Sequence, residues 1–186
     1  MADKITLVAP EALDPIRHDR AGFTCGVNQL DHFLKQQARK DAPDLSLTFV
    51  LTCREEPGAI LGYYTLSSTK LQADDLPDRL RKTLGKYGAI PATLLGRLAT
   101  ATSYQRHPEL RVGEALVIDA MLRFHRASQD VASFGIVVDV LKTETIDPTG
   151  FYLRYGFIAC TETANRMYLP KQTITKILKK SDLIQS

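Results

Sequence analysis

The sequence predicts a mixed α/β fold, because it combines strand and helix patterns in the order that such a fold requires. Residues 45–53 (LSLTFVLTC) and 59–71 (AILGYYTLSSTKL) are rich in β-branched and aromatic residues and predict an antiparallel hairpin. Residues 94–123 (LLGRLATATSYQRHPELRVGEALVIDAMLR) predict a strand, a basic loop and an amphipathic helix. Residues 133–141 (SFGIVVDVL) form an apolar run typical of a central strand that is covered on both faces.

The chain before the hairpin is expected to contain a strand and a helix. Residues 5–9 (ITLVA) predict a first short strand. Asn28 is expected to open the helix, with Asp31 three residues later in an arrangement that resembles a capping box. Apolar residues at helical spacing give this helix one buried face, and they are Leu30, Phe33, Leu34 and Ala38. Pro43 should end the helix.

The chain after the hairpin is expected to alternate between helices and strands. These elements are predicted at 76–84, 94–101, 112–126, 133–141, 147–155, 157–162 and 166–170. Asp147 and Pro148 supply an N-cap and a first-turn proline for the short helix, and Gly156 closes it. The tail at 171–186 is basic and predicts an amphipathic helix or a frayed end.

The composition predicts one domain over residues 1–186 and excludes several classes of protein. A chain of 186 residues with 44% hydrophobic content can bury one core. Apolar runs long enough to cross a bilayer are absent, and the N-terminus lacks the core of a signal peptide, so a cytoplasmic protein is expected. The three cysteines are widely spaced, with no ligand-like pairing with histidine, so neither a disulfide framework nor a metal site is predicted.

The stretch from 94 to 123 carries the first functional signal. A loop whose amides converge with a helix N-terminus is a general solution for holding a phosphate group. Arg106, His107 and Arg111 make this loop basic. The sequence therefore predicts an anion site here.

Four segments, in order, resemble the GNAT superfamily of acyl-CoA-dependent N-acetyltransferases, and most closely the GNAT toxins of bacterial toxin–antitoxin pairs. They are FTCGVNQLDHFLKQQA (23–38), GYYTLSS (62–68), IPATLLGRLAT with GEALVIDAMLR (90–100 and 113–123), and GFYLRYGF with RMYLP (150–157 and 166–170). The resemblance implies a single-domain GNAT fold. Its mixed central β-sheet would splay between strands four and five, here 94–101 and 133–141, with flanking helices.

The resemblance also implies acetyl-CoA as the cosubstrate. Its pantetheine arm would lie in the splay and its pyrophosphate at the start of the 112–126 helix. The implied cofactor-binding residues are Leu98, Ala99, Thr100, Arg106, Leu110, Arg111, Val112, Gly113 and Glu114.

The loop departs from the family pattern Gln/Arg-x-x-Gly-x-Gly/Ala at two positions, where Pro108 and Arg111 stand. Glycine lets a backbone approach phosphate closely, whereas arginine pairs with phosphate oxygens through its guanidinium group. Retained binding is expected, with a degraded cradle as the alternative.

The catalytic acid implied by the resemblance is Tyr152, on the short helix after the fifth strand. Such a tyrosine protonates the departing thiolate. The alternative is that Tyr152 only packs against the sheet, and Tyr155, one turn further on, is the competing candidate. The sequence offers no clear general base. Asp119 is assigned a structural role, through pairing with Arg123.

Resemblance to the toxins implies the α-amino group of an aminoacyl-tRNA as the acceptor, so that acetylation would block translation. Basic residues would then contact tRNA phosphates, and the candidates are Arg39, Lys40, Arg79, Arg81, Lys82, Lys86 and Arg97. Solvated helix faces are the alternative explanation of these charges. A ribbon-helix-helix antitoxin and a homodimer are the other implied partners. The competing functions are a GNAT that acetylates a protein N-terminus or a small amine, and a catalytically silent GNAT-fold binding module.

Overall fold

The computed structural model describes residues 5–185, and its strands form one mixed sheet in the order β1-β2-β3-β4-β5-β7-β6. The strands are β1 (Glu11–Ala12), β2 (Leu47–Leu51), β3 (Gly62–Gln72), β4 (Ala89–Thr100), β5 (Gly135–Asp139), β6 (Ile158–Ala159) and β7 (Arg166–Pro170). β4 and β5 are parallel, whereas β1–β2, β2–β3, β5–β7 and β6–β7 are antiparallel. The predicted mixed α/β fold is confirmed.

Six α-helices accompany the strands within residues 5–185. They are α1 (Asn28–His32), α2 (Ala38–Asp41), α3 (Asp78–Leu84), α4 (Val112–Asp130), α5 (Thr149–Arg154) and α6 (Lys171–Lys180). A π-helical turn at Phe33–Gln37 joins α1 to α2, so the three pieces form one continuous helical segment. None of the helices in this part of the chain is both long and apolar enough to cross a membrane.

The chain folds as two compact units. The first comprises Met1–Ser67 and Gly96–Ala120, and the second comprises Ser68–Leu95 and Met121–Ser186. Strands β3 and β4 and helix α4 each begin in one unit and end in the other. The parallel ladder between β4 and β5 joins Thr93 to Ile136 and Leu94 to Val137, just before β4 enters the first unit. A ladder of only two residue pairs is consistent with two strands that splay apart beyond it.

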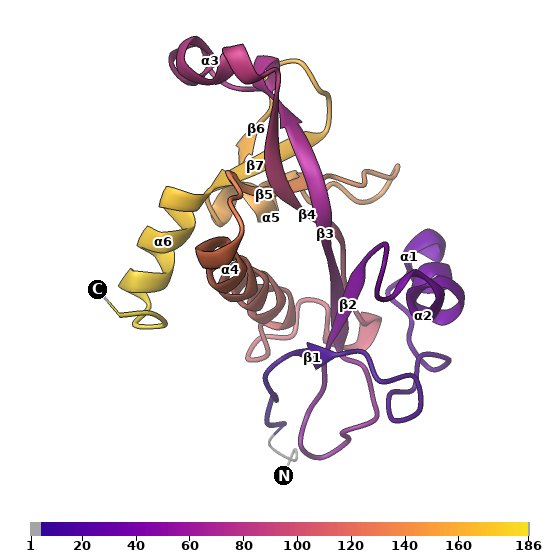
Figure 1. Cartoon of the computed structure of the whole chain (residues 1–186). Helices are drawn as coiled ribbons and strands as arrows, with labels where there is room; N and C mark the ends of the chain where they lie inside the picture. Colours follow the sequence, from indigo (N-terminus) through magenta and orange to yellow (C-terminus); the bar gives the residue numbers. More distant parts are fainter. Residues whose placement is uncertain (1–4, 186) are drawn as a thin grey trace. The chain divides into compact units, whose positions relative to one another are not determined.

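The core of the first unit forms where the α1–α2 segment packs on the sheet, and Figure 1 shows this segment beside β2. The Tyr63 ring lies against Phe23 and Phe33, at centroid distances of 5.5 Å and 6.2 Å. The Tyr63 hydroxyl donates a hydrogen bond of 2.8 Å to the carbonyl of Leu30. A buried tyrosine with a bonded hydroxyl therefore fixes the helical segment against β3.

The core of the second unit centres on β5 and β7, which pair from Gly135 with Pro170 to Asp139 with Arg166. Gly135 allows the closest approach in this pair, because a Cβ atom there would lie 2.2 Å from the carbonyl oxygen of Leu169. Ile174 and Leu178 are the buried residues of α6, so the basic tail is a helix through Lys180. In Figure 1, α3 lies at the far end of the β3–β4 hairpin.

The first predicted strand, at 5–9, is wrong in position. Leu7 makes only an isolated bridge to Cys53, and the paired strand is β1, where Glu11 faces Val50. Pro10 lies between the two and has no amide hydrogen to donate to a ladder, which accounts for the interruption.

The helix predicted to begin at Asn28 does begin there, but the capping box is wrong. Val27 is the N-cap residue, and no side chain caps the helix. Asp31 instead accepts hydrogen bonds from the Cys25 amide at 2.8 Å and the Thr24 hydroxyl at 2.9 Å. The carboxylate therefore ties the helix to the preceding loop.

The remaining boundaries differ from the predictions by a few residues. β4 begins at Ala89 rather than at 94, α4 continues to Asp130 rather than to 126, and β6 spans Ile158–Ala159 rather than 157–162. The predicted N-cap of α5 is wrong, because the N-cap residue is Pro148 and no side chain caps the helix. Asp147 lies one residue earlier and accepts a hydrogen bond of 2.9 Å from the Thr149 amide, which closes a local Asx turn. Hydrogen bonds from Thr149 lower the pKa of Asp147 to about 2.

Candidate functional site

The predicted anion cradle lies in the first unit, where β4 ends at Thr100 and α4 begins at Val112. Gly62 on β3 fixes this junction. A Cβ atom on Gly62 would lie 2.9 Å from the Ala99 carbonyl oxygen and 2.8 Å from the Val112 side chain. Both Val112 and Leu116 are buried. The end of β4 and the first turns of α4 therefore pack at the closest distance that glycine permits.

The loop from Ala101 to Arg111 is held by its own polar groups. The Gln105 side chain donates hydrogen bonds to the carbonyls of Thr100, at 2.9 Å, and Cys25, at 2.8 Å. His107 Nδ1 accepts from the amide of Leu110 at 3.1 Å. Arg106 adopts a left-handed conformation with φ of 58°. The Thr100 carbonyl is one of the groups predicted to bind pantetheine. It accepts a hydrogen bond from Gln105 with one of its two lone pairs, which leaves the other lone pair for a ligand.

The start of α4 can bind an anion. The amide of Ala115 donates a hydrogen bond of 2.9 Å to the carbonyl of Arg111, the residue before α4. In any α-helix the amides before this one have no intrahelical acceptor, and here they belong to Val112, Gly113 and Glu114. These amides point along the helix axis toward its positive end, where phosphate oxygens bind well.

Arg111 lies beside these amides and forms an exposed ion pair with Glu114. Its Nη1 atom is 3.0 Å from Glu114 Oε2, and its side chain is 76% exposed. An exposed pair of this kind contributes about 1 kcal/mol at most, so a phosphate group can displace Glu114 from the guanidinium group. The donors at this position fit a pyrophosphate group.

The nine residues predicted to bind the cofactor all fall in the first unit. They occupy the end of β4 (Leu98, Ala99, Thr100), the loop (Arg106, Leu110, Arg111) and the first turn of α4 (Val112, Gly113, Glu114). Ala99 and Val112 are buried, and Arg106 and Arg111 are exposed. Ala99 and Val112 therefore belong to the packed side of the junction, and the two arginines are open to solvent.

Tyr152 lies in the second unit, on α5, and is 6% exposed. Its ring packs between Phe151 and Phe157, with both centroids 5.3 Å away. Within residues 5–185 its hydroxyl has no hydrogen-bond partner, so its proton is available to a bound group. Burial raises the pKa of Tyr152 to about 12, which keeps the phenol protonated at neutral pH.

Two other candidates have structural explanations. The Tyr155 ring packs on Phe151 at a centroid distance of 5.0 Å and is half-buried. Asp119 accepts a hydrogen bond from the hydroxyl of Tyr64, a fully buried residue of β3. This contact between helix and sheet gives Asp119 a structural role. The spacing along the helix pointed only to Arg123, because it cannot indicate a partner such as Tyr64 on another element.

The predicted tRNA-binding cations differ in how freely they can meet a phosphate group. Arg97 is half-buried, and its guanidinium carbon lies 3.7 Å from the centroid of the Phe33 ring, which fixes the side chain. Arg81 is paired with Asp78. The remaining cations are exposed, and they are Arg39 and Lys40 in the first unit and Arg79, Lys82 and Lys86 in the second.

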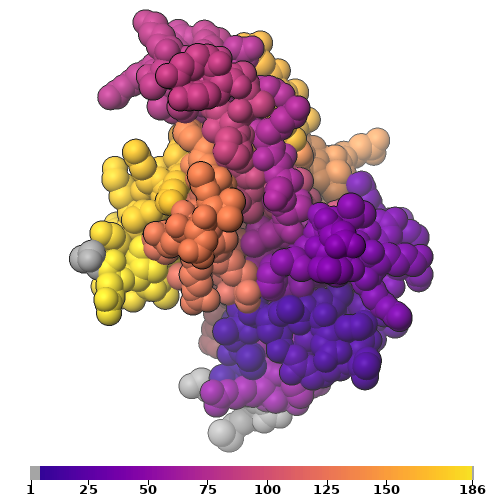
Figure 2. Space-filling view, viewed as in Figure 1, coloured from indigo at the N-terminus to yellow at the C-terminus, as the bar shows by residue number. Residues whose placement is uncertain are grey.

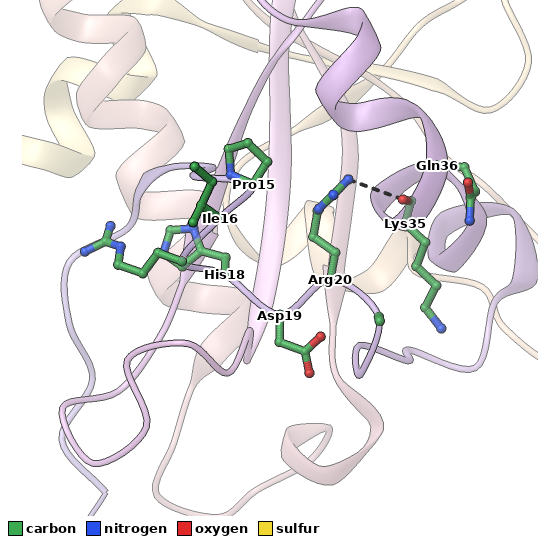
Figure 3. Close-up of a pocket in the computed structure, with 9 residues that line it drawn as sticks. Pro15, Ile16, His18, Asp19, Arg20, Lys35 and Gln36 are labelled. Atoms are coloured by element: carbon green, nitrogen blue, oxygen red, sulfur yellow. Dashed lines mark hydrogen bonds between the residues drawn. The ribbon is translucent and has the colours of Figure 1, made fainter.

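A surface hollow of about 480 Å³ lies elsewhere in the first unit, between the loop at 15–21 and the helical segment (Figure 3). Arg20 spans it by donating a hydrogen bond of 3.3 Å to the carbonyl of Lys35. His18 is buried at its edge, and its Nδ1 atom accepts a 2.9 Å bond from the amide of Asp14. None of the predicted site residues lines this hollow.

No protein-family model matches the chain, but individual proteins do. A probable toxin TacT from Sinorhizobium fredii is 30% identical over 172 residues, which cover 90% of this chain and 93% of the relative. A tRNA-acetylating toxin from Mycobacterium tuberculosis is 29% identical over 154 residues, with coverage of 82% and 87%.

Solved structures match over most of the chain as well. A tyrosine-to-phenylalanine mutant of KacT superposes with a TM-score of 0.81 at 31% identity, covering 92% of this chain and 99% of KacT. AtaT complexed with acetyl-methionyl-tRNAfMet gives 0.79 at 28% identity, with coverage of 92% and 99%. A tyrosine-to-phenylalanine mutant of AtaT bound to the C-terminus of the antitoxin AtaR and to acetyl-CoA gives 0.73 at 28% identity, with coverage of 92% and 98%.

Proposed function

We propose that this chain, which belongs to the GNAT-fold toxin family of TacT, AtaT and KacT, transfers the acetyl group of acetyl-CoA to the α-amino group of an aminoacyl-tRNA and so blocks translation. The observation that carries the proposal is the match over almost the whole chain to a tRNA-acetylating toxin and to AtaT with an acetylated tRNA. An acetylated amino group can no longer attack a peptidyl ester, so the modified tRNA is lost to elongation.

The geometry at the start of α4 supports the proposed cofactor contacts. The amides of Val112, Gly113 and Glu114, together with the Arg111 guanidinium group, hold the pyrophosphate of acetyl-CoA. Main-chain groups of Leu98, Ala99 and Thr100 at the end of β4 hold its pantetheine arm. Arg106 and Leu110 complete the set from the loop. Bound acetyl-CoA supplies the thioester from which the acetyl group is transferred.

The acid of the reaction is Tyr152. The neutral acceptor amine attacks the acetyl carbonyl carbon, a C–N bond forms, the C–S bond breaks, and Tyr152 Oη gives its proton to the departing sulfur. The proton that the amine loses restores the phenol. Because the pKa of Tyr152 is raised to about 12, positioning rather than acidity has to provide most of its effect.

Replacing Tyr152 tests this assignment. In Tyr152→Phe the ring keeps its packing between two phenylalanines, so folding and acetyl-CoA affinity should be unchanged. Loss of a general acid should lower kcat about 100-fold or more. The measurement is the initial rate of acetylation of charged tRNA, with Tyr155→Phe as the matched control at near wild-type rate. A Tyr152→Phe enzyme with the wild-type kcat would remove Tyr152 from the mechanism.

The proposed acceptor contacts are cations, because the backbone of tRNA is a polyanion. We assign phosphate binding to Arg39, Lys40, Arg79, Arg81, Lys82, Lys86 and Arg97. The exposed members can adapt to a backbone phosphate, whereas Arg97 is held on the Phe33 ring and presents a fixed charge.

The partners follow from the same family membership. We propose an antitoxin with a ribbon-helix-helix DNA-binding end. The AtaT structure that contains the C-terminus of AtaR supports the antitoxin as a partner. A homodimer and a cytoplasmic location, where charged tRNA is found, are part of the same proposal. Co-purification with the product of the neighbouring gene and light scattering of the isolated toxin test the first two.

Two other functions give different results in simple assays. A GNAT that acts on protein N-termini or small amines would acetylate peptides and leave charged tRNA unmodified. A silent binding module would show no heat on titration with acetyl-CoA.

A further inference from the structure

An aromatic side chain stands exposed at the end of the α3 segment. Tyr87 is 63% exposed and lies in the short 3-10 turn Gly85–Tyr87 that follows α3. Figure 2 shows this segment, in magenta to pink, projecting at the surface. A large ring at such a position covers no core, although Leu80 and Leu84 of the same segment do pack against the core of the second unit.

The turn that carries Tyr87 is held on both sides. The Gly88 amide donates a hydrogen bond of 3.1 Å to Gly85, and the Gly88 carbonyl accepts one of 2.8 Å from Ala73. Gly88 adopts a φ of 64°, which a residue with a side chain would adopt only under strain. Tyr87 is therefore presented on an anchored turn, and ordering its backbone for a ligand costs little conformational entropy.

Positive charge lies beside the ring and along the helix that precedes it. Lys86 Nζ lies 5.0 Å from the centroid of the Tyr87 ring. Arg79, Lys82 and Lys86 are exposed and recur at i, i+3 and i+7, whereas Asp78 neutralises Arg81. A flat aromatic face beside several unneutralised cations suits a ligand that has both phosphates and aromatic bases.

We propose that Tyr87 stacks on an unpaired nucleobase of the acceptor tRNA while Arg79, Lys82 and Lys86 bind the adjoining phosphates. This inference rests on the proposed function and adds to it a base-contacting residue outside the set of cations. The unpaired base belongs either to the single-stranded 3′ end or to a loop of the tRNA. Stacking tolerates any base, so Tyr87 contributes affinity rather than sequence selectivity.

Equilibrium binding at several salt concentrations tests the proposal, because stacking and phosphate contacts respond differently to salt. The affinity of charged tRNA is measured for the full-length wild type, Tyr87→Ala, Tyr87→Phe and Lys82→Ala. Loss of one stacked base should raise the Kd of Tyr87→Ala about tenfold. The slope of log Kd against log salt should not change in this variant, whereas Lys82→Ala should flatten it by just under one unit. Tyr87→Phe keeps the ring and should bind within about twofold of wild type.

Each outcome separates this inference from the function on which it rests. Wild-type binding by Tyr87→Ala, or a change confined to the salt slope, would overturn the stacking role while leaving tRNA acetylation intact. A wild type that neither binds nor acetylates charged tRNA would overturn both.

If Tyr87→Ala binds the antitoxin more weakly but tRNA normally, the ring contacts a protein partner and the proposal is wrong. An effect that persists with an acceptor-stem minihelix places the base at the 3′ end, and an effect seen only with whole tRNA places it in a loop.

Discussion

At the scale of single residues, Arg111 is the sharpest departure from the GNAT pattern. It stands where the motif has glycine, its carbonyl accepts a hydrogen bond from the amide of Ala115, and it pairs with Glu114 at 3.0 Å. If the guanidinium group holds pyrophosphate, Arg111→Gly should raise the Kd of acetyl-CoA about fivefold, since one charge-assisted hydrogen bond in an exposed site is worth about 1 kcal/mol. Isothermal titration calorimetry measures this directly.

Glu114→Gln provides the matched control for Arg111. It removes the competing carboxylate and leaves the arginine in place, so acetyl-CoA should bind more tightly than to the wild type. Opposite changes in the two variants support a phosphate contact. Equal or tighter binding by Arg111→Gly would mean that arginine is merely tolerated at this position.

Sequence motifs single out candidate site residues, but they do not show how those residues are held. The motif around Tyr152 identifies the tyrosine, but the packing on Phe157 that raises its pKa depends on how the chain folds back after α5. Gln105, which binds the Cys25 carbonyl 80 residues away, shows no sequence pattern at all. Contacts of this kind depend on tertiary packing, which local periodicity does not encode.

At the scale of elements, the α1–α2 segment depends on Asp31 for its attachment to the preceding loop. Burial alone would raise the pKa of Asp31, but hydrogen bonds from Cys25 and Thr24 hold it below its ordinary value. Asp31→Asn should lower the free energy of unfolding by about 1–2 kcal/mol at pH 7, because two hydrogen bonds to a charged group are weakened. Urea denaturation followed by circular dichroism measures the loss.

The pH dependence of this loss identifies its cause. Because the folded-state pKa of Asp31 is depressed, its contribution is fully present above its unfolded-state pKa of about 4 and disappears as the pH falls through the folded-state value. The difference between wild type and Asp31→Asn should therefore shrink below pH 4. Asp44→Asn, an exposed change in the loop after the same segment, should have no effect. A constant difference from pH 7 to the acid limit would contradict the role of the charge.

Elements with a strong pattern are predicted well, and those that depend on a neighbour are not. The β2–β3 hairpin and the order β4–α4–β5 follow from periodicity and turn signals. β1 has two residues and exists because Glu11 and Ala12 meet Val50 and Phe49 on β2. The first residues of β4 lie outside the predicted strand at 94–101, although Ile90 and Ala92 alternate into the core of the second unit. Proline at position 91 hides this alternation, because proline is rare within strands.

At the scale of the whole molecule, the neighbouring positions of β4 and β5 were implied by family resemblance and not by any pattern in the residues. The continuous apolar run along β5 indicates burial on both faces but does not identify β4 and β7 as its neighbours. The division into two units was not anticipated either, because no linker or change of composition marks it. The division passes through β3, β4 and α4 themselves.

That division leads to a test of the single domain expected from the sequence. Three elements continue from one unit into the other, so unfolding either unit removes half of β3, β4 and α4 and should unfold the other. Val50→Ala in the first core and Val137→Ala in the second should each cost roughly 2 kcal/mol through the cavity they leave. Native-state hydrogen exchange of the slowest amides in β2 and β5 reports the two units separately. Each variant should lower the protection of both strands by the same free energy. If Val50→Ala lowered it in β2 alone, the two units would be independent domains.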